Sequence, residues 1–221
     1  MSHHADNPVA KSGVIKLFPT YVWATQLKPE VFEPLNAQIQ AYLEELETGR
    51  PELGGLGQWQ TAQDLHLQPA FAGLVQIITA NARGICDSLT LLYDRLDITG
   101  CWANVSRTGF PHRQHTHPNN YLSGAYYVKT APGADSISFH DPRPQASLVV
   151  PPARDQDRVN TDLVALDVRA GMLVVFPAWL EHSVSPNESD ATRISVAFNL
   201  MFPDFGSRMA SPLWRGDADS R

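Results

Sequence analysis

The strongest constraint on the fold is a series of short strand-like runs in the second half of the chain. After Asp97, segments rich in Val, Ile, Tyr and Phe are separated by turns that contain Pro, Gly, Asn and Asp. The runs are CWANVSR, YLSGAYYV, SISFH, ASLVVPP, DLVALDV, GMLVVFP, HSVSP and RISVAFNLMF. Many short strands joined by polar turns are typical of an antiparallel sandwich or barrel. Helices do not alternate with these strands, so a doubly wound parallel sheet is disfavoured.

The first third of the chain is predicted to be mostly helical. Apolar residues recur at helical spacing from Val31 to Leu46, and Gly49 closes that helix. A second apolar stripe runs from Leu74 to Leu92. The glycine-rich residues 51–65 between the two helices are predicted to form a loop or lid. The two helices are therefore expected to cover one sheet of the β region.

We expect residues 1–221 to form a single domain, because this length suits one domain with a large core. A helical support region with a first strand is predicted for residues 13–95. The β core is predicted for residues 98–203, and residues 206–221 are predicted to be a loosely packed tail.

Charge and polarity exclude several classes of partner. The net charge of −6 argues against a nucleic-acid or anionic-membrane surface. No apolar run is long enough to cross a bilayer, and the polar start has no hydrophobic signal core, so a cytoplasmic location is expected. Cys86 and Cys101 are too few for a disulfide framework and are predicted to be buried thiols. His3 and His4 are interpreted as residues of a flexible terminus.

Three of the eight histidines stand in a pattern that suits a metal ion. In a strand, residues two apart project from the same face, so His115 and His117 of the HTH motif are expected to point together. His182 follows the apolar strand MLVVF and begins the next run. An imidazole there can complete a site with the upstream pair. The alternative is that the first two histidines lie on a polar surface loop and that His182 is a core residue.

An arginine and a serine share one face of the last strand-like run, TRISVAFNLMF. Alternation places Arg193, Ser195, Ala197 and Asn199 on one side and Ile194, Val196 and Phe198 on the other. A buried guanidinium is costly unless it meets an anion. Arg193 and Ser195 together can hold a carboxylate, through a bidentate fork and a hydroxyl. The alternative is a strand end with Arg193 in water.

Taken in this order, the motifs resemble the Fe(II)/2-oxoglutarate-dependent oxygenases, and most closely a bacterial and phage branch related to prolyl hydroxylases. The superfamily pattern is His-x-Asp/Glu, a distant His, and an Arg-x-Ser about ten residues later. The resemblance covers residues 98–203 and implies a double-stranded β-helix, the jelly roll shared with cupins. It implies His115, His117 and His182 as ligands of Fe(II), and Arg193, Ser195 and Tyr127 as contacts of the co-substrate 2-oxoglutarate.

The chain departs from the family at the second ligand, where His117 replaces a carboxylate. Three readings follow. His117 itself binds the metal, water takes the position, or a carboxylate from elsewhere serves, with Asp141 as the nearest candidate. The first is favoured, and an imidazole in place of a carboxylate leaves the iron more positive.

The cupins are a rival match. Gly109, His115, His117, Gly171, Pro177 and His182 fit much of the two cupin motifs. However, no glutamate follows the first histidine pair, and Arg193 and Ser195 have no place in that pattern. The alternative function is therefore a cupin-like metalloenzyme that does not use 2-oxoglutarate. A third hypothesis is a sugar- or peptide-binding jelly roll without catalysis.

The function that the resemblance implies is a dioxygenase. It hydroxylates a substrate with O2 and releases succinate and CO2, with an apolar lining from Val174, Phe176 and Phe198. The substrate stays open between a small molecule and a peptide side chain, and a homodimer is one option for the assembly. Trp102 and Asn199 are expected to be structural, Asn104 is expected on a strand beside the site, and three histidines are expected not to bind metal: His66, His112 and His140.

Overall fold

A computed structural model describes residues 11–15, 17–145, 148–149 and 151–204. His3, His4 and the predicted tail at 206–221 lie outside the described residues.

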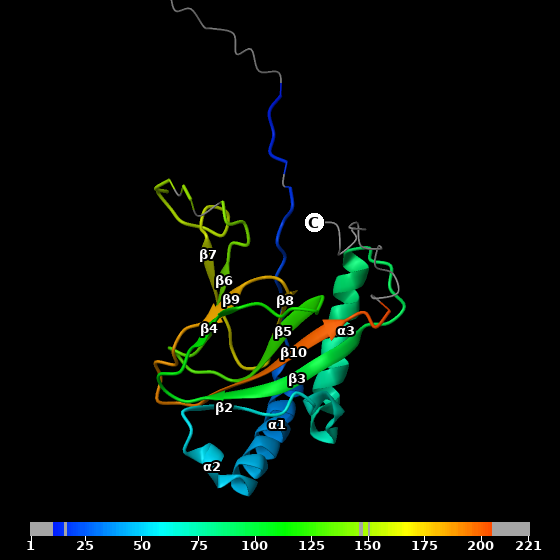
Figure 1. Ribbon diagram of the computed structural model, residues 1–221, viewed down its shortest axis with the longest axis vertical. Helices are drawn as coiled ribbons and strands as arrows, with labels where there is room; N and C mark the ends of the chain where they lie inside the picture. The colour runs from blue at the N-terminus through cyan, green and yellow to red at the C-terminus, as the bar shows by residue number, and fades with distance from the viewer. Residues whose placement is uncertain (1–10, 16, 146–147, 150, 205–221) are drawn as a thin grey trace, which may run out of the picture.

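Within those ranges, ten strands form two sheets in which paired strands run antiparallel (Figure 1). One sheet has the order β1-β8-β5-β10-β3-β2 and the other the order β4-β9-β6-β7. The bounds are β1 Trp23–Gln26, β2 Gln58–Gln60, β3 Asp97–Ser106, β4 His112–His115, β5 Leu122–Lys129, β6 Ser136–His140, β7 Leu163–Asp167, β8 Met172–Pro177, β9 His182–Val184 and β10 Arg193–Met201. Neighbours within each sheet are mostly distant in sequence, as in a double-stranded β-helix. The predicted fold class, mainly β with N-terminal helices, is confirmed.

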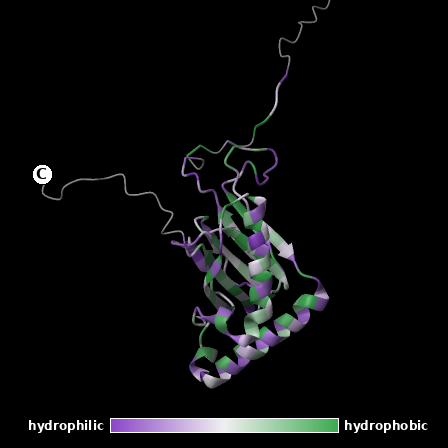
Figure 2. Ribbon diagram, turned by 90° about the vertical axis from the view of Figure 1, so that its right-hand side faces the viewer, coloured by the Kyte–Doolittle hydropathy of each residue, from purple (hydrophilic) through white to green (hydrophobic). Residues whose placement is uncertain are grey.

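The helices pack on one face of the six-stranded sheet. They are α1 (Pro29–Gly49), α2 (Pro51–Gly54) and α3 (Ala72–Ser88), with 3₁₀ turns η1 (Leu65–Leu67) and η2 (Pro69–Phe71). Pro29 and Pro51 stand in the first turns of α1 and α2, where a missing N–H costs nothing. In Figure 2 the helices carry both hydrophilic and hydrophobic residues, while the strands behind them are mostly hydrophobic. The prediction was wrong for Leu92, which lies beyond α3 and is 94% exposed.

Helix α1 is attached to the sheet by one buried polar residue. Asn36 donates from Nδ2 to the carbonyl of Val128 at 2.8 Å, and its Oδ1 accepts from the Tyr126 hydroxyl at 2.7 Å. Because both ends of the amide are hydrogen-bonded, the cost of burying Asn36 is offset. This pair of bonds fixes α1 against β5.

Strand β10 separates two hydrophobic cores. Val196 and Phe198 belong to the core between the sheet and the helices. A second core, which includes Val174 and Phe176, contains residues of both sheets. The predicted alternation along β10 is therefore correct. Of the three predicted apolar lining residues, only Phe176 lines the pocket between the two sheets. Val174 lies in the second core, and Phe198 faces the helices.

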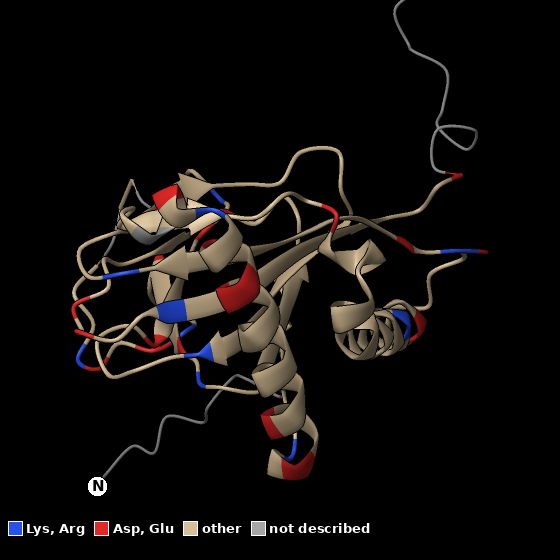
Figure 3. Cartoon of the chain, turned by 90° about the horizontal axis from the view of Figure 1, so that it is seen from below, with Lys and Arg blue, Asp and Glu red and all other residues tan. Residues whose placement is uncertain are grey.

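Two edge strands come from the helical first third of the chain. β1 pairs with β8, and β2 pairs with β3 at the opposite edge of the sheet. The predicted run ASLVVPP forms no strand in its described residues, and Leu148 and Val149 are each 79% exposed. Charged residues lie mostly on helices and connecting loops rather than on the strands (Figure 3). None of the helices in the described residues is long and apolar enough to span a membrane.

Candidate active site

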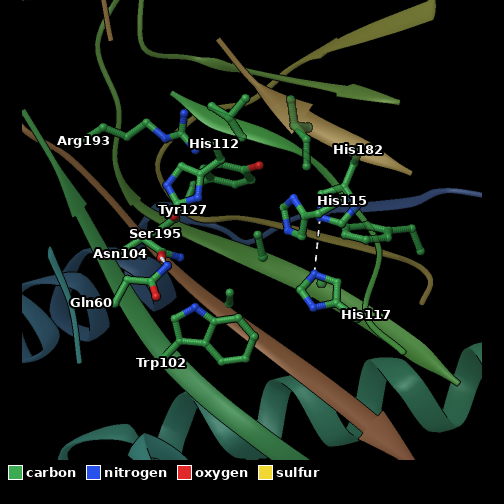
Figure 4. Close-up of a pocket in the computed structure, with 16 residues that line it drawn as sticks. Gln60, Trp102, Asn104, His112, His115, His117, Tyr127, His182, Arg193 and Ser195 are labelled. Atoms are coloured by element: carbon green, nitrogen blue, oxygen red, sulfur yellow. Dashed lines mark hydrogen bonds between the residues drawn. The ribbon is translucent and has the colours of Figure 1, made fainter. Parts of the chain in front are cut away.

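A pocket lies between the two sheets, and it contains the residues predicted to bind a metal and those predicted to bind a carboxylate (Figure 4). The six-stranded sheet contributes side chains from β2, β3, β5, β8 and β10, and the four-stranded sheet contributes side chains from β4, β6 and β9. The described lining contains one arginine, four histidines and no aspartate or glutamate. The pocket is therefore suited to an anion.

The structure brings His115, His117 and His182 together. Each offers a ring nitrogen, and these three atoms lie within 4.8 Å of one another. The strand register accounts for two of them, since His115 on β4 lies opposite His182 on β9. The Nε2 atoms of His117 and His182 are 3.3 Å apart.

His117 joins this group for a different reason from the one predicted. β4 ends at His115, so the rule that residues two apart share a face does not apply to His117. Instead, the backbone N–H of His117 donates to the carbonyl of Ala178 at 2.9 Å. This bond holds the segment after β4 against the turn between β8 and β9, and it directs the third imidazole into the pocket.

Backbone carbonyls set the orientation of two of these rings. Nδ1 of His115 lies 2.7 Å from the carbonyl of Arg113, and Nδ1 of His182 lies 2.9 Å from the carbonyl of Leu180. Since a carbonyl only accepts, each Nδ1 carries the proton and each Nε2 keeps its lone pair. Burial lowers the pKa of His117 and of His182 to about 4. Those two imidazoles are therefore neutral at pH 7, the form that binds metal.

Arg193 is a buried cation in this pocket. It is 5% exposed, and none of the ion pairs found among the described residues includes it. Burial lowers its pKa, while the neighbouring Tyr127 acts in the opposite direction. The guanidinium carbon is 6.0 Å from the centre of the Tyr127 ring. An unpaired buried cation of this kind is stabilised by an anionic ligand.

Ser195 and Tyr127 supply neutral donors beside Arg193. Both are buried and line the pocket. The two residues are register partners on β10 and β5. The Tyr127 hydroxyl is buried without a hydrogen-bond partner in the described part of the chain, and burial raises its pKa to about 12. It therefore stays protonated and has a hydrogen bond to give.

A polar wall of the pocket was largely missed from the sequence. Gln60 on β2 donates from Nε2 to Oδ1 of Asn104 at 2.6 Å, and Nε2 of Gln58 lies 2.7 Å from Nε2 of His112. The alternation in QWQ could have indicated this wall, because it places both glutamines on one face of a strand whose other face carries a buried tryptophan. Trp102 was expected to be structural, but it lines the pocket, with its ring centre 6.0 Å from that of His117.

Other candidates lie outside the metal group. Asp141 forms an ion pair with Arg143 at 2.6 Å and lines a different cavity. Among the described residues, the group able to hold a metal contains three imidazoles and no carboxylate, so Asp141 is not the missing ligand. His140 lies against Ser183 at 2.9 Å.

The remaining predicted residues take structural positions. His66 lies in η1, and Asn199 accepts a hydrogen bond from Ser123 at 2.7 Å. Cys86 and Cys101 are buried free thiols, as predicted.

A family model described as "Putative 2OG-Fe(II) oxygenase" matches residues 100–199. The matched region runs from β3 to β10 and therefore contains the three histidines, Arg193, Ser195 and Tyr127. Over these residues the β core matches the 2OG-Fe(II) oxygenase family. The resemblance inferred from the sequence motifs is thus confirmed. No curated protein matches the chain.

Solved structures of 2OG-Fe(II) oxygenases share the fold. HygX from Streptomyces hygroscopicus, solved with nickel and 2-oxoglutarate bound, has 13% identity and a TM-score of 0.57, covering 83% of each chain. The carbocyclase SnoK from nogalamycin biosynthesis has 18% identity and a TM-score of 0.58, covering 89% of this chain and 90% of its own. A Pseudomonas putida prolyl-4-hydroxylase has 15% identity and a TM-score of 0.55, with coverages of 82% and 92%. At these identities the likeness establishes the fold.

Proposed function

We propose that this 2OG-Fe(II) oxygenase is a non-haem dioxygenase that hydroxylates a substrate and releases succinate and CO2. The observation that carries the proposal is one pocket with three converging imidazoles and a buried arginine for which the described residues supply no acidic partner. In the overall reaction, one atom of O2 enters succinate and the other enters the substrate hydroxyl. A cupin-like enzyme without 2-oxoglutarate leaves Arg193 unexplained.

We assign His115, His117 and His182 as the metal ligands. An ion held at about 2.1 Å by two imidazoles at right angles separates their nitrogens by about 3 Å. The separation of 3.3 Å between the Nε2 atoms of His117 and His182 is close to this value. The carbonyls of Arg113 and Leu180 contact Nδ1 of His115 and of His182 and orient these rings, as such partners do for metal-binding histidines. Three nitrogen donors therefore fit a divalent transition-metal ion such as Fe(II).

We assign Arg193, Ser195 and Tyr127 to the co-substrate. 2-Oxoglutarate carries two carboxylates, and the guanidinium of Arg193 can bind one of them with two parallel hydrogen bonds. The hydroxyls of Ser195 and Tyr127 add neutral donors on the same side of the pocket. Binding would pair the buried cation and give the Tyr127 hydroxyl an acceptor.

The protein positions the reactants and limits the access of water. When bound, Fe(II) supplies the redox chemistry that couples O2 reduction to decarboxylation of 2-oxoglutarate and oxidation of a substrate C–H bond. Ile137, Phe176 and Val184 form apolar lining between the metal ligands and the second core. They exclude water from the reacting groups. A cytoplasmic location, the absence of a nucleic-acid partner and a homodimer stay predictions.

An anaerobic titration tests the assignment. Fe(II) is added to the full-length chain, followed by 2-oxoglutarate, and the visible charge-transfer band is recorded. We expect a band for the parent and for His117→Asp, which restores a carboxylate, and at least a tenfold weaker metal affinity for His117→Ala. His140→Ala is the control, because that histidine lies outside the metal group.

Two results would contradict the proposal. Metal binding without any response to 2-oxoglutarate would favour the cupin-like alternative. Unchanged metal affinity in His117→Ala would remove His117 from the ligand set.

A further inference from the structure

We propose that Gln60 and Asn104 recognise an amide group of the substrate whose N–H and C=O point the same way. This inference rests on the proposed function, because it concerns the substrate of the same pocket. Gln60 and Asn104 are register partners on β2 and β3, and both line the pocket. Figure 4 shows the two side chains facing each other across one wall.

The hydrogen bond between the two carboxamides leaves one donor and one acceptor side by side without a partner among the described residues. Gln60 donates from Nε2 to Oδ1 of Asn104 at 2.6 Å, and this is the one side-chain bond of either residue within the described ranges. Gln60 Oε1 stays free to accept, and Asn104 Nδ2 stays free to donate. Exchanging oxygen and nitrogen in both groups reverses the roles and again leaves one free donor beside one free acceptor.

This pattern selects a chemical class. A primary carboxamide or a lactam presents an N–H and a C=O on the same side and can satisfy both free groups. A trans peptide bond directs these groups in opposite directions, so it can satisfy only one. A carboxylate has no proton for Gln60 Oε1, and an ammonium has no acceptor for Asn104 Nδ2. The substrate is therefore expected to carry a primary carboxamide or a lactam.

The pair is held in place before any ligand arrives. Between the two glutamines of β2, Trp59 is buried in the core beneath the helices, so the strand is anchored on its opposite face. At the other end of the strand, Nε2 of Gln58 lies 2.7 Å from Nε2 of His112, and this contact holds that end in place. Preorganised groups lose less conformational entropy on binding.

The position of Gln60 and Asn104 suits a role in binding substrate rather than a structural role in the core. Asn104 is buried at 7% exposure, whereas Gln60 is exposed, so together they connect the interior of the pocket with its mouth. In the view of Figure 4, Trp102 lies between Gln60 and His117. The indole can pack against an apolar part of the substrate, which then extends from the amide pair toward the metal ligands.

Four small-molecule probes test the inference on the full chain loaded with Co(II) and 2-oxoglutarate. Dissociation constants are measured by ligand-detected NMR for benzamide, δ-valerolactam, benzoate and N,N-dimethylbenzamide. We expect benzamide to bind about fivefold or more tightly than benzoate and the dimethyl compound, as one lost neutral hydrogen bond predicts. Comparing the dissociation constants of δ-valerolactam and benzamide shows whether the site prefers a lactam or a primary carboxamide.

Two variants make the test specific. Gln60→Leu should remove the preference for benzamide over N,N-dimethylbenzamide. Gln60→Glu replaces a donor by acceptors and should shift the preference toward benzamidine, a cationic donor that is measured as a fifth probe. Gln26→Leu is the control, because Gln26 is also exposed on an edge strand but lies on β1, at the far edge of the sheet.

The titration of 2-oxoglutarate in the same samples separates the two proposals. Equal affinities for the four probes, or an unchanged preference in Gln60→Leu, would overturn the assignment of the pair. A large loss of 2-oxoglutarate affinity in Gln60→Leu would also overturn it, because the pair would then belong to the co-substrate. Failure of the parent chain to bind 2-oxoglutarate at all would instead reject the proposed function.

Discussion

Replacing Arg193 by methionine should have opposite effects on binding and on stability. In the ligand-free protein Arg193 is 5% exposed, and the described residues provide no ion pair for its guanidinium. Breaking a buried, hydrogen-bonded charge pair costs about 3 kcal/mol or more, because it leaves the other charge unpaired. We therefore expect Arg193→Met to weaken 2-oxoglutarate binding by about 150-fold, the factor that corresponds to 3 kcal/mol.

The same substitution should not weaken the ligand-free fold. Without 2-oxoglutarate, the buried cation contributes a desolvation cost that methionine avoids, and apolar replacements of buried ions are often neutral or stabilising. We expect the free energy of unfolding of Arg193→Met, measured in urea without ligand, to equal or exceed that of the parent. At a 2-oxoglutarate concentration 100 times its dissociation constant, the parent should gain about 2.7 kcal/mol of stability, and the variant should gain almost none.

Arg107→Met provides a matched control. Arg107 lies just after β3 and forms an ion pair with Glu47 at 2.6 Å, so its charge is satisfied without ligand. Both side chains are about one third exposed, and such pairs contribute at most about 1 kcal/mol. This variant should lose a little stability and keep its affinity for 2-oxoglutarate in isothermal titration calorimetry with Co(II). The reasoning fails if Arg193→Met binds 2-oxoglutarate within threefold of the parent, or if it unfolds much more easily.

Two further predictions concern stability. Metal-free protein should become less stable as the pH falls from 7 toward 4. Burial lowers the pKa of three imidazoles from 6.5 to about 4 in the folded chain, namely those of His112, His117 and His182. The unfolded state therefore binds more protons in this range, and protonation favours unfolding. Urea unfolding at pH 7 and pH 5 measures this change, and equal stabilities would contradict it. Gly84→Ala, at an exposed position of helix α3, should stabilise by about 1 kcal/mol. Gly124→Ala on β5 should destabilise by about 1–3 kcal/mol, because its Cβ would collide with the Val174 carbonyl. The same urea series checks this pair, and destabilisation by both would show that the space around Gly84 was misjudged.

The sequence predicted most of the candidate site because its residues stand in short local motifs. Arg193 and Ser195 are two apart in a regular strand, so alternation alone placed them on one face. His115 and His182 flank turns that antiparallel strands bring together. The reasoning for His117 was wrong although the residue does lie beside the other two, since a long-range bond to Ala178 rather than strand periodicity positions it.

The polar wall could not be predicted in the same way. Residues 51–65 contain enough glycine to suggest a loop or lid, and nothing local indicates that Gln58–Gln60 pairs with β3. Likewise, Asp141 is a plausible ligand from its residue type alone. Only the position of Arg143 and the separate cavity exclude it.

The amino-acid order alone therefore determined the strand-like runs, the two helices and the residue types available for metal and anion binding. The reason is that the spacing of apolar residues within each element depends only on the local sequence. Tertiary structure decided which of these residues meet. Strand order, and the few hydrogen bonds between distant segments, set the distances between side chains, and those distances give the pocket its chemistry.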